Sequence, residues 1–340
     1  MSETILEKIL SDAYRNNMPV TCLFEITRHC FFSCKHCYAY DNKRRREMSF
    51  GEICSVLKQL KNAGTLFLTI TGGEPLSRKD FLRIVRFADK MGFYLTIFSN
   101  AYLLDQRTVK ALSGLNIYYV GISLYGAKQS THDGITGQPG SFDRLISAVK
   151  LLKKNGIGVV LKLVLMENNA TEHKAMKRLA KKLKAVCQAD PTITPRDNAG
   201  LSPVRLRPSA GSLRKIFVDW KKGLAFCEKN VLPQEFFECA AGRSFCAVNA
   251  YGDLLACVQI PVSAGSLLKR KFSDIWRNSR LLRKLRGIKM SDISECADCK
   301  IARYCGRCPG LAYVEDGSLY GKSSEACRQS RIMKSIMDTN

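Results

Sequence analysis

Three cysteines stand close together near the start of the chain, in the segment RHCFFSCKHCYAY at residues 28–40. They are Cys30, Cys34 and Cys37, so three thiols fall within eight positions. A disulfide uses two thiols, and a closed structural zinc site uses four ligands. The odd set therefore predicts a metal site that leaves one coordination position open.

An iron–sulfur cluster could use such a set. A cubic four-iron cluster normally takes four cysteine thiolates, so a protein that supplies three leaves one iron exposed to an outside ligand. The chain has fifteen cysteines, and its N-terminal segment MSETILEKIL is acidic and lacks the apolar block of a signal peptide. Clustered thiols in a protein without an export signal favour metal binding over a disulfide framework.

The CxxxCxxC spacing resembles the cluster motif of the radical S-adenosylmethionine (SAM) superfamily. The match extends to Gly72, Gly73, Glu74 and Pro75, which reproduce that family's GGEP segment. The resemblance implies that this segment holds the amino group of the SAM methionine. Its glycines let the backbone approach closely, and its carboxylate can accept hydrogen bonds from an ammonium group. A chance zinc site without a fourth ligand is the alternative interpretation.

Four further positions are expected to contact SAM because they resemble the same family. Ser99 and Asn100 stand where the family often has a Thr-Asn-Gly turn, although Ala101 replaces the glycine. Ser123 resembles a serine that hydrogen-bonds SAM in peptide-modifying members. The resemblance also places Tyr38, directly after Cys37, against the adenine.

Eight cysteines in the last third of the chain form a second pattern. They are Cys239, Cys246, Cys257, Cys296, Cys299, Cys305, Cys308 and Cys327. This pattern resembles the SPASM extension of radical SAM enzymes, which holds two auxiliary iron–sulfur clusters, here expected to be [4Fe–4S]. The resemblance implies one cluster on Cys239, Cys246, Cys257 and Cys308, and another on Cys296, Cys299, Cys305 and Cys327. Full ligation would favour electron transfer; two structural zinc sites remain the alternative.

Two positions differ from the anaerobic sulfatase maturases of this family. Related maturases carry an arginine where this chain has Thr136, so the resemblance leaves the partner of the SAM carboxylate unassigned. They also follow the cysteine equivalent to Cys257 with a catalytic aspartate, whereas this chain has Val258. Sulfatase maturation is therefore not expected.

These motifs need a scaffold that brings distant loops together. Apolar, β-branched runs predict six strands, at residues 20–27, 65–71, 93–99, 117–125, 157–166 and 185–193, with helical segments between them, the clearest over 141–154. Such alternation predicts parallel strands joined by right-handed crossovers. The motif loops follow the first three strands, at the edge where such sheets bind ligands. The predicted fold is α/β, a partial (β/α)6 TIM-type barrel with a small cysteine-rich C-terminal auxiliary-cluster domain.

The sequence divides into four predicted parts. Residues 1–19 form a helical lead-in, 20–193 the radical SAM core, 194–237 a connector and 238–340 the SPASM domain. Within the connector, Arg196 and Asp197 could reach substrate or lie in a solvated loop.

The net charge of +24 comes from basic stretches at 42–47, 173–184 and 267–289. Attraction to nucleic acid or to an acidic partner is one interpretation. Solvated helix faces are the favoured one, because the stretches lack interleaved aromatic residues that would stack on bases. No apolar run reaches the roughly 18–20 residues of a membrane helix. We therefore expect a cytoplasmic protein that binds neither membrane nor nucleic acid.

The resemblance implies reductive cleavage of SAM to a 5′-deoxyadenosyl radical, which abstracts hydrogen from a peptide or protein substrate. An external one-electron donor of the flavodoxin or ferredoxin type would reduce the cluster. Because 29 residues precede Cys30, recognition of a leader peptide is expected to need a separate protein. Two alternatives stay open: a radical SAM enzyme for a small molecule or tetrapyrrole precursor, and a basic zinc-binding nucleic-acid module. The sequence specifies neither the bond formed nor whether SAM is regenerated.

Overall fold

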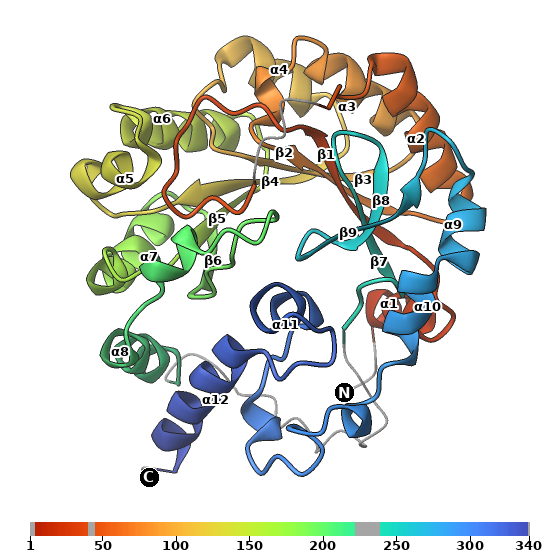
Figure 1. Cartoon of the computed structure of the whole chain (residues 1–340). Helices are drawn as coiled ribbons and strands as arrows, with labels where there is room; N and C mark the ends of the chain where they lie inside the picture. Colours follow the sequence, from red (N-terminus) through yellow and green to blue (C-terminus); the bar gives the residue numbers. More distant parts are fainter. Residues whose placement is uncertain (1–3, 40–44, 222–238, 339–340) are drawn as a thin grey trace.

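The central feature of the computed structural model is one curved sheet of nine strands, in the order β6-β5-β4-β3-β2-β1-β7-β8-β9 (Figure 1). The structure describes residues 4–39, 45–221 and 239–338. Strands β1 to β6 pair in parallel, each with the next along the chain. Their bounds are β1 (Thr21–Thr27), β2 (Phe67–Gly72), β3 (Tyr94–Ser99), β4 (Ile117–Leu124), β5 (Val159–Val164) and β6 (Val186–Asp190). Each lies within a predicted strand or overlaps it, so the expected α/β fold is confirmed.

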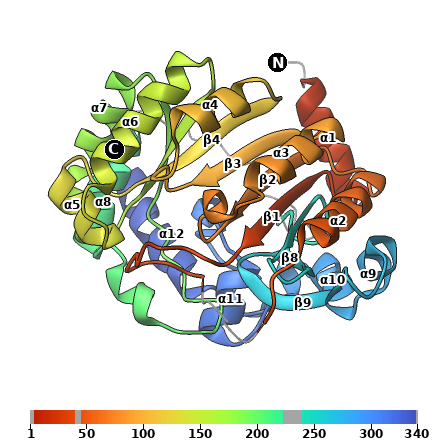
Figure 2. The same ribbon diagram turned by 90° about the horizontal axis from the view of Figure 1, so that it is seen from above.

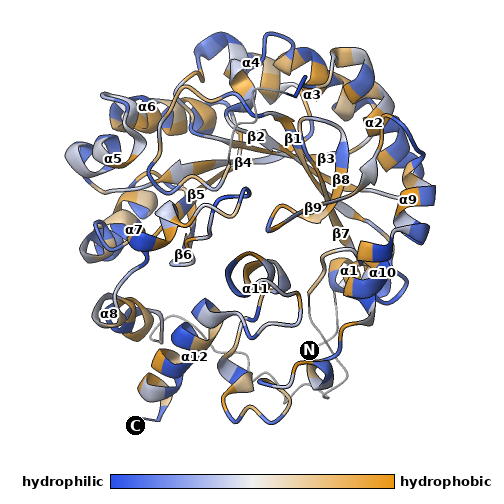
Figure 3. Cartoon of the chain, in the orientation of Figure 1, coloured by the Kyte–Doolittle hydropathy of each residue, from blue (hydrophilic) through white to orange (hydrophobic). Residues whose placement is uncertain are grey.

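Helices cover the outer face of this sheet (Figures 1 and 2). They are α2 (Phe50–Asn62), α3 (Phe81–Lys90), α4 (Gln106–Ser113), α5 (Gln129–Thr136), α6 (Ser141–Lys154), α7 (His173–Lys182) and α8 (Ala210–Lys221). Helix α1 (Ile5–Arg15) precedes β1 and lies near α10, Arg280–Gly287 (Figure 1). The central strands are mostly hydrophobic, whereas the outer helices mix hydrophobic and hydrophilic residues, as expected for helices with one buried face (Figure 3). None of the helices in the described ranges has the length and apolarity needed to cross a membrane.

Alternation along each strand separates the core from the barrel interior. In β1, Cys22, Phe24 and Ile26 are fully buried in the hydrophobic core. Glu25, between the last two, lines a cavity on the opposite side of the sheet. Successive side chains of a strand point to opposite faces, so one face packs beneath the helices and the other faces the interior.

The C-terminal part of the chain extends the same sheet. Strand β7 (Phe245–Val248) pairs in parallel with β1, and an antiparallel unit of β8 (Asp253–Cys257) and β9 (Ile260–Ser266) follows. These three strands were not predicted. The predicted connector boundary at residue 237 lies outside the described residues.

Two C-terminal helices span the open side of the barrel. After α9 (Phe272–Asn278) and α10 (Arg280–Gly287), helix α11 (Pro309–Asp316) contacts β9, and α12 (Ser324–Met337) contacts α8 (Figures 1 and 2). Arg207, in the segment before α8, forms ion pairs with Glu315 of α11 and with the buried Glu325 of α12. Arg328 also pairs with Glu325, at 2.7 Å. This network ties the C-terminal helices to the end of the barrel.

The loop after β2 lies against the loop after β1. Gly73 donates its backbone N–H to Thr27 O at 2.8 Å, and Glu74 donates to His29 O at 2.8 Å. A Cβ atom added at Gly73 would lie 2.3 Å from His29 O, and one added at Gly72 would lie 2.2 Å from Thr27 O. Both positions therefore require glycine, because only a residue without Cβ permits this approach.

This contact predicts the effect of Gly73→Ala. The added methyl group meets backbone that cannot move aside, so we expect a loss of about 1–3 kcal/mol in the free energy of unfolding. The matched control is Gly51→Ala, in the first turn of α2, where an added Cβ meets nothing within 4 Å. That change is expected to stabilise the protein by about 0.5–1 kcal/mol. Chemical denaturation of the anaerobically purified protein measures both, and equal effects would contradict the assignment.

Candidate functional site

The three N-terminal cysteines lie in the loop that follows β1. The end of α5 supports this loop, because Ser33 N–H donates to Thr136 O at 3.1 Å and Lys35 N–H donates to Ile135 O at 3.3 Å. Gly137 follows with a φ of 70°, and a Cβ there would lie 2.3 Å from Ser33 Oγ. The loop is thus fixed by backbone contacts with a distant helix.

The chemistry of these three thiols suits a metal cluster. Burial raises the pKa of the Cys30 thiol to about 11 and that of Cys34 to about 12, and the neighbouring thiols of the loop add to both shifts. Burial likewise raises the pKa of Cys37. Three thiolates gathered in a partly buried loop need a strong positive charge among them, and bound metal supplies it. The residues present therefore fit the expected cluster.

The GGEP loop meets the loop after β3 beside this cluster loop. Glu74 is fully buried, and its carboxylate accepts hydrogen bonds from Ser99 Oγ at 2.8 Å, Asn100 N–H at 2.7 Å and Leu76 N–H at 3.1 Å. Asn100 Nδ2 in turn lies 4.0 Å from Cys30 Sγ. The structure thus brings together three of the predicted motifs, although each comes from a different strand end.

The buried Glu74 carboxylate is suited to a cationic ligand. Burial raises its pKa to about 7, despite the three hydrogen bonds that favour its charged form. A ligand ammonium group nearby would lower this pKa again, because an opposite charge stabilises the carboxylate. Pro75 follows in a short 3-10 turn, Pro75–Ser77, and the Glu74 side chain caps this turn by accepting from Leu76 N–H. The contact between Glu74 and the SAM amino group stays a prediction.

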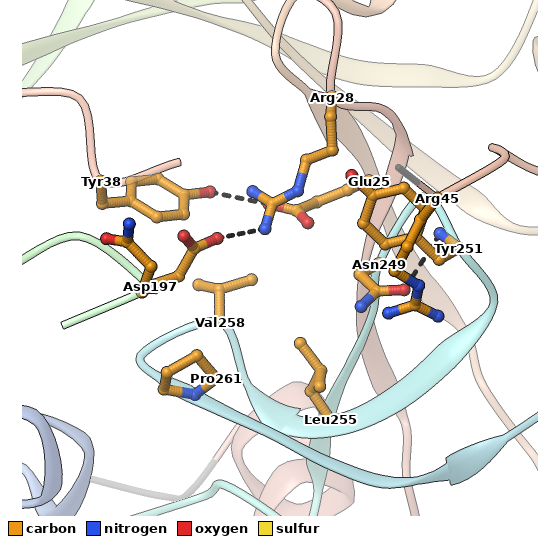
Figure 4. A pocket seen from close by; sticks show the side chains of 11 residues that line it. Glu25, Arg28, Tyr38, Arg45, Asp197, Asn249, Tyr251, Leu255, Val258 and Pro261 are labelled. Atoms are coloured by element: carbon orange, nitrogen blue, oxygen red, sulfur yellow. Dashed lines mark hydrogen bonds and ion pairs between the residues drawn. The ribbon is translucent and has the colours of Figure 1, made fainter. Parts of the chain in front are cut away.

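Ser123 and Tyr38 have different hydrogen-bond partners. Ser123 is near the end of β4, and its hydroxyl contacts the buried phenol of Tyr125. The Tyr38 hydroxyl instead donates to Glu25 Oε1 at 3.0 Å, and its ring lines a cavity toward the C-terminal strands (Figure 4). The contact of Tyr38 with adenine stays a prediction. In this structure the Tyr38 hydroxyl is hydrogen-bonded to Glu25.

A residue that sequence analysis did not select, His36, also lies in the cluster loop. Its ring packs 4.5 Å from the ring of Tyr125, and its Nδ1 is buried without a hydrogen-bond partner among the described residues. Burial lowers the His36 pKa to about 4, so the ring is neutral. A buried polar atom without a partner is a position where a ligand can supply the missing hydrogen bond.

A cavity of about 210 Å³ opens between the cluster loop and the β8–β9 unit (Figure 4). One wall is charged: Arg28 lies 3.4 Å from Glu25 and forms a second ion pair with Asp197. The opposite wall is apolar. The lining residues are Glu25, Arg28, Tyr38, Arg45, Asp197, Asn198, Asn249, Tyr251, Leu255, Val258 and Pro261.

The position of this cavity relates it to both cysteine regions. Tyr38 follows Cys37 of the cluster loop, and Val258 follows Cys257 of the C-terminal set. The sequence-based suggestion that Asp197 could reach substrate agrees with its place in the wall, whereas Arg196 is not among the lining residues. Glu25 was missed. The sequence feature that could have identified Glu25 is its charge at an inward position of an otherwise apolar strand.

The C-terminal cysteines form two groups of interacting thiols. Burial raises the pKa of Cys257 to about 12, with further contributions from Cys239 and Cys308. Burial also raises the pKa of Cys296 to about 11, with contributions from Cys327, Cys305 and Cys299. The first group thus contains Cys239, Cys257 and Cys308, and the second contains Cys296, Cys299, Cys305 and Cys327.

Cys246 lies apart from the first group, and its expected role as a ligand there stays a prediction. It lies in β7, fully buried, directly beside Cys22 of β1, and the two thiols hydrogen-bond. Its side chain joins the hydrophobic core that also contains Cys22. Alternation along β7 explains this place, because a parallel neighbour in register presents its side chain to the same face.

Arg307, between Cys305 and Cys308, lies near both groups of C-terminal cysteines. Its guanidinium donates to Gly321 O at 2.9 Å through Nε and to Leu319 O at 2.5 Å through Nη2. Its charge interacts with Cys296 and Cys305 of the second group and with Cys308 and Cys239 of the first. A fixed cation between two sets of thiolates favours their charged forms.

Among the described residues, no three His, Cys, Asp or Glu side chains are placed to hold one metal ion. The ligation of the C-terminal clusters stays a prediction.

Comparison with known proteins places two family models on the chain. The model of the radical SAM superfamily matches residues 24–180, and the SPASM iron–sulfur cluster-binding domain matches residues 239–300. The AdoMet-dependent heme synthase of Methanosarcina barkeri is 24% identical over 329 residues, covering 88% of this chain and 94% of the relative. The mycofactocin maturase MftC of Mycolicibacterium smegmatis is 26% identical over 329 residues, covering 90% and 82%.

Solved structures show the same fold at low sequence identity. Streptococcus suis SuiB, bound to its precursor peptide SuiA, superimposes with a TM-score of 0.73 and 17% identity, covering 94% of this chain and 80% of SuiB. The protein anSMEcpe with bound AdoMet gives a TM-score of 0.68 and 17% identity, covering 95% of this chain and all of that chain.

The position of Cys246 in the hydrophobic core predicts different iron contents for two cysteine variants. Cys257→Ala removes a thiol of the first C-terminal group, so iron is expected to fall by about four atoms per chain from about twelve. Cys246→Ala removes a core thiol and is expected to leave iron unchanged. Colorimetric iron determination after anaerobic reconstitution measures both. A comparable loss of iron in Cys246→Ala would restore it as a ligand.

Proposed function

The chain belongs to the radical SAM superfamily and carries a SPASM domain, and on this basis we propose that it abstracts hydrogen from a peptide or protein substrate. Cys30, Cys34 and Cys37 would hold the [4Fe–4S] cluster at which SAM binds. When bound and reduced, this cluster supplies the electron that splits SAM into methionine and a 5′-deoxyadenosyl radical. The protein's own residues position the reactants and exclude water.

The residues around the cluster loop have distinct parts in this proposal. Glu74 offers a buried carboxylate to the SAM ammonium group, held in place by Ser99 and Asn100. The glycines at 72 and 73 let that loop approach the cluster loop. Ser123 provides a hydroxyl from β4.

The size of the cavity beside the cluster loop favours a peptide. Pockets for drug-sized ligands occupy roughly 300–1,000 Å³, so a cavity of about 210 Å³ is smaller than that class. It suits one amino-acid side chain of a longer chain whose remainder lies outside. The similarity to the maturase MftC and to SuiB, which was solved with its precursor peptide, supports the same choice.

A small-molecule or tetrapyrrole substrate remains the second candidate. The observation that favours it is the similarity to the AdoMet-dependent heme synthases, which extends over 94% of the Methanosarcina barkeri relative. The third alternative, a zinc-binding nucleic-acid module, is set aside because the chain belongs to a superfamily of enzymes.

The auxiliary regions and partners complete the proposal. Cys296, Cys299, Cys305 and Cys327 would fill one auxiliary cluster, and Cys239, Cys257 and Cys308 would contribute to another. A flavodoxin or ferredoxin type of protein would supply electrons. The basic surface would attract an acidic leader peptide, with or without a separate leader-binding protein, and its affinity would fall as salt is added.

Cleavage of SAM tests the core of this proposal. The anaerobically reconstituted protein, given SAM and dithionite, is expected to release 5′-deoxyadenosine, measured by liquid chromatography and mass spectrometry. Cys34→Ala removes one of three cluster thiols and is expected to abolish the product. The control Cys54→Ala changes a cysteine of α2, outside the cluster loop, and should retain formation of this product. Equal product from all three proteins would refute the assignment.

The substrate class needs a separate test. Candidate precursor peptides encoded near this gene, and a tetrapyrrole carboxylate, are incubated with enzyme, SAM and reductant. We expect a peptide to lose hydrogen, seen as a mass decrease in multiples of about 1 Da. In Val258→Phe the larger side chain fills the cavity, so modification should fall at least about tenfold. Substrate-independent formation of 5′-deoxyadenosine should stay within about twofold. Change in the tetrapyrrole alone would favour the second candidate.

A further inference from the structure

A lysine faces the interior of the barrel beside the predicted SAM contact Ser123. Lys162 lies in β5, where it pairs with Ser123 of β4 on one side and with Gln188 of β6 on the other. Its neighbours Leu161 and Leu163 are buried in the hydrophobic core. Because side chains alternate along a strand, Lys162 points to the opposite face and forms a row with Ser123 and Gln188.

The surroundings of Lys162 contain neutral partners. Its ammonium group lies 4.8 Å from the centroid of the Phe98 ring and 5.9 Å from that of Tyr119, and it donates to Gln188 Oε1. Gly121 makes room for this packing, since a Cβ there would lie 2.6 Å from the Phe98 ring. No ion pair to Lys162 is found among the carboxylates of the described residues.

Because Lys162 is partly buried and has no counter-ion among the described residues, its charged form is destabilised. Burial lowers its pKa, and the more distant Asp190 offsets part of that shift. A half-buried ammonium group beside aromatic rings is stabilised by an anion that enters the site. The strand pairing places Lys162 beside Ser123.

The position that carries a cation in related maturases cannot supply one here. Thr136 is uncharged and fully buried, and its hydroxyl is shared with Ser141 Oγ at 2.8 Å and Asp133 O at 3.2 Å. Two other cations near the cluster loop, Arg28 and Arg78, are already paired. Arg28 binds Glu25 and Asp197, and Arg78 binds Asp80 and two backbone carbonyls.

We propose that Lys162 binds the carboxylate of SAM, with Ser123 as its neighbour in the same row. This inference rests on the proposed function, because it requires SAM in the barrel. The sequence resemblance left the partner of the SAM carboxylate unassigned, and this proposal assigns that role to a residue of β5. Lys162 acts as a binding residue and takes no part in the reaction of the radical.

The test compares SAM with decarboxylated SAM, an analogue that keeps the sulfonium and the amine but lacks the carboxylate. Equilibrium dialysis on reconstituted protein without reductant gives dissociation constants independent of turnover. We expect the wild type to prefer SAM by about 10- to 100-fold, the range of a charge-assisted hydrogen bond. Lys162→Met and Lys162→Gln should reduce this preference while binding the analogue within about twofold of the wild type.

Lys150→Met is the matched control, since it removes the same charge from an exposed position on α6. It should keep the preference for SAM. The proposal is overturned if both Lys162 variants keep the preference, or if they weaken SAM and the analogue equally. Failure of the proposed function gives a different result, because the wild type would then bind neither compound.

Discussion

The structure depends on the close approach of two loops at the carboxyl edge of the sheet. The loop after β2 hydrogen-bonds through its backbone to the loop after β1, at Gly73 and Glu74, with no side chain between them. That contact buries the Glu74 carboxylate and brings Ser99 and Asn100 onto it. Asn100 then reaches Cys30. One steric constraint, the absence of Cβ at two positions, thus fixes the relation between the thiols and the groups expected to hold SAM.

The same strand that carries the cluster loop also carries the C-terminal domain. β1 pairs with β2 on one side and with β7 on the other, so the two cysteine-rich regions are joined through a single hydrogen-bonded strand. The cavity lies where they meet, with a charged wall from the barrel and an apolar wall from β8 and β9. The cavity therefore has one side near the cluster loop and another near Cys257.

Sequence patterns predicted the barrel well because its signals are local. Apolar runs marked strands β1 to β6, and helix α6 has the bounds that were expected for residues 141–154. Strands β7 to β9 escaped prediction because they lie among glycines and cysteines. The core position of Cys246 could not be predicted, because cysteine spacing carries no information about which face of a strand a thiol occupies. Glu25 and Lys162 were missed although each interrupts an apolar strand with a charge. Ala101 adopts a φ of 67°, a conformation that favours glycine, so the turn persists despite the replacement.

The ion pairs at Arg207 bear on how molecules enter and leave. Arg207 and Glu325 clamp the C-terminal helices to the barrel end, while β7 holds the other side of the same domain by main-chain hydrogen bonds. Because both ends of this domain are held, it cannot rotate as a rigid body without breaking either the ion pairs or the strand pairing. Ligands would therefore enter and leave the barrel interior through movements of loops. The rate of ligand exchange would be governed by these short segments and not by rotation of the whole domain.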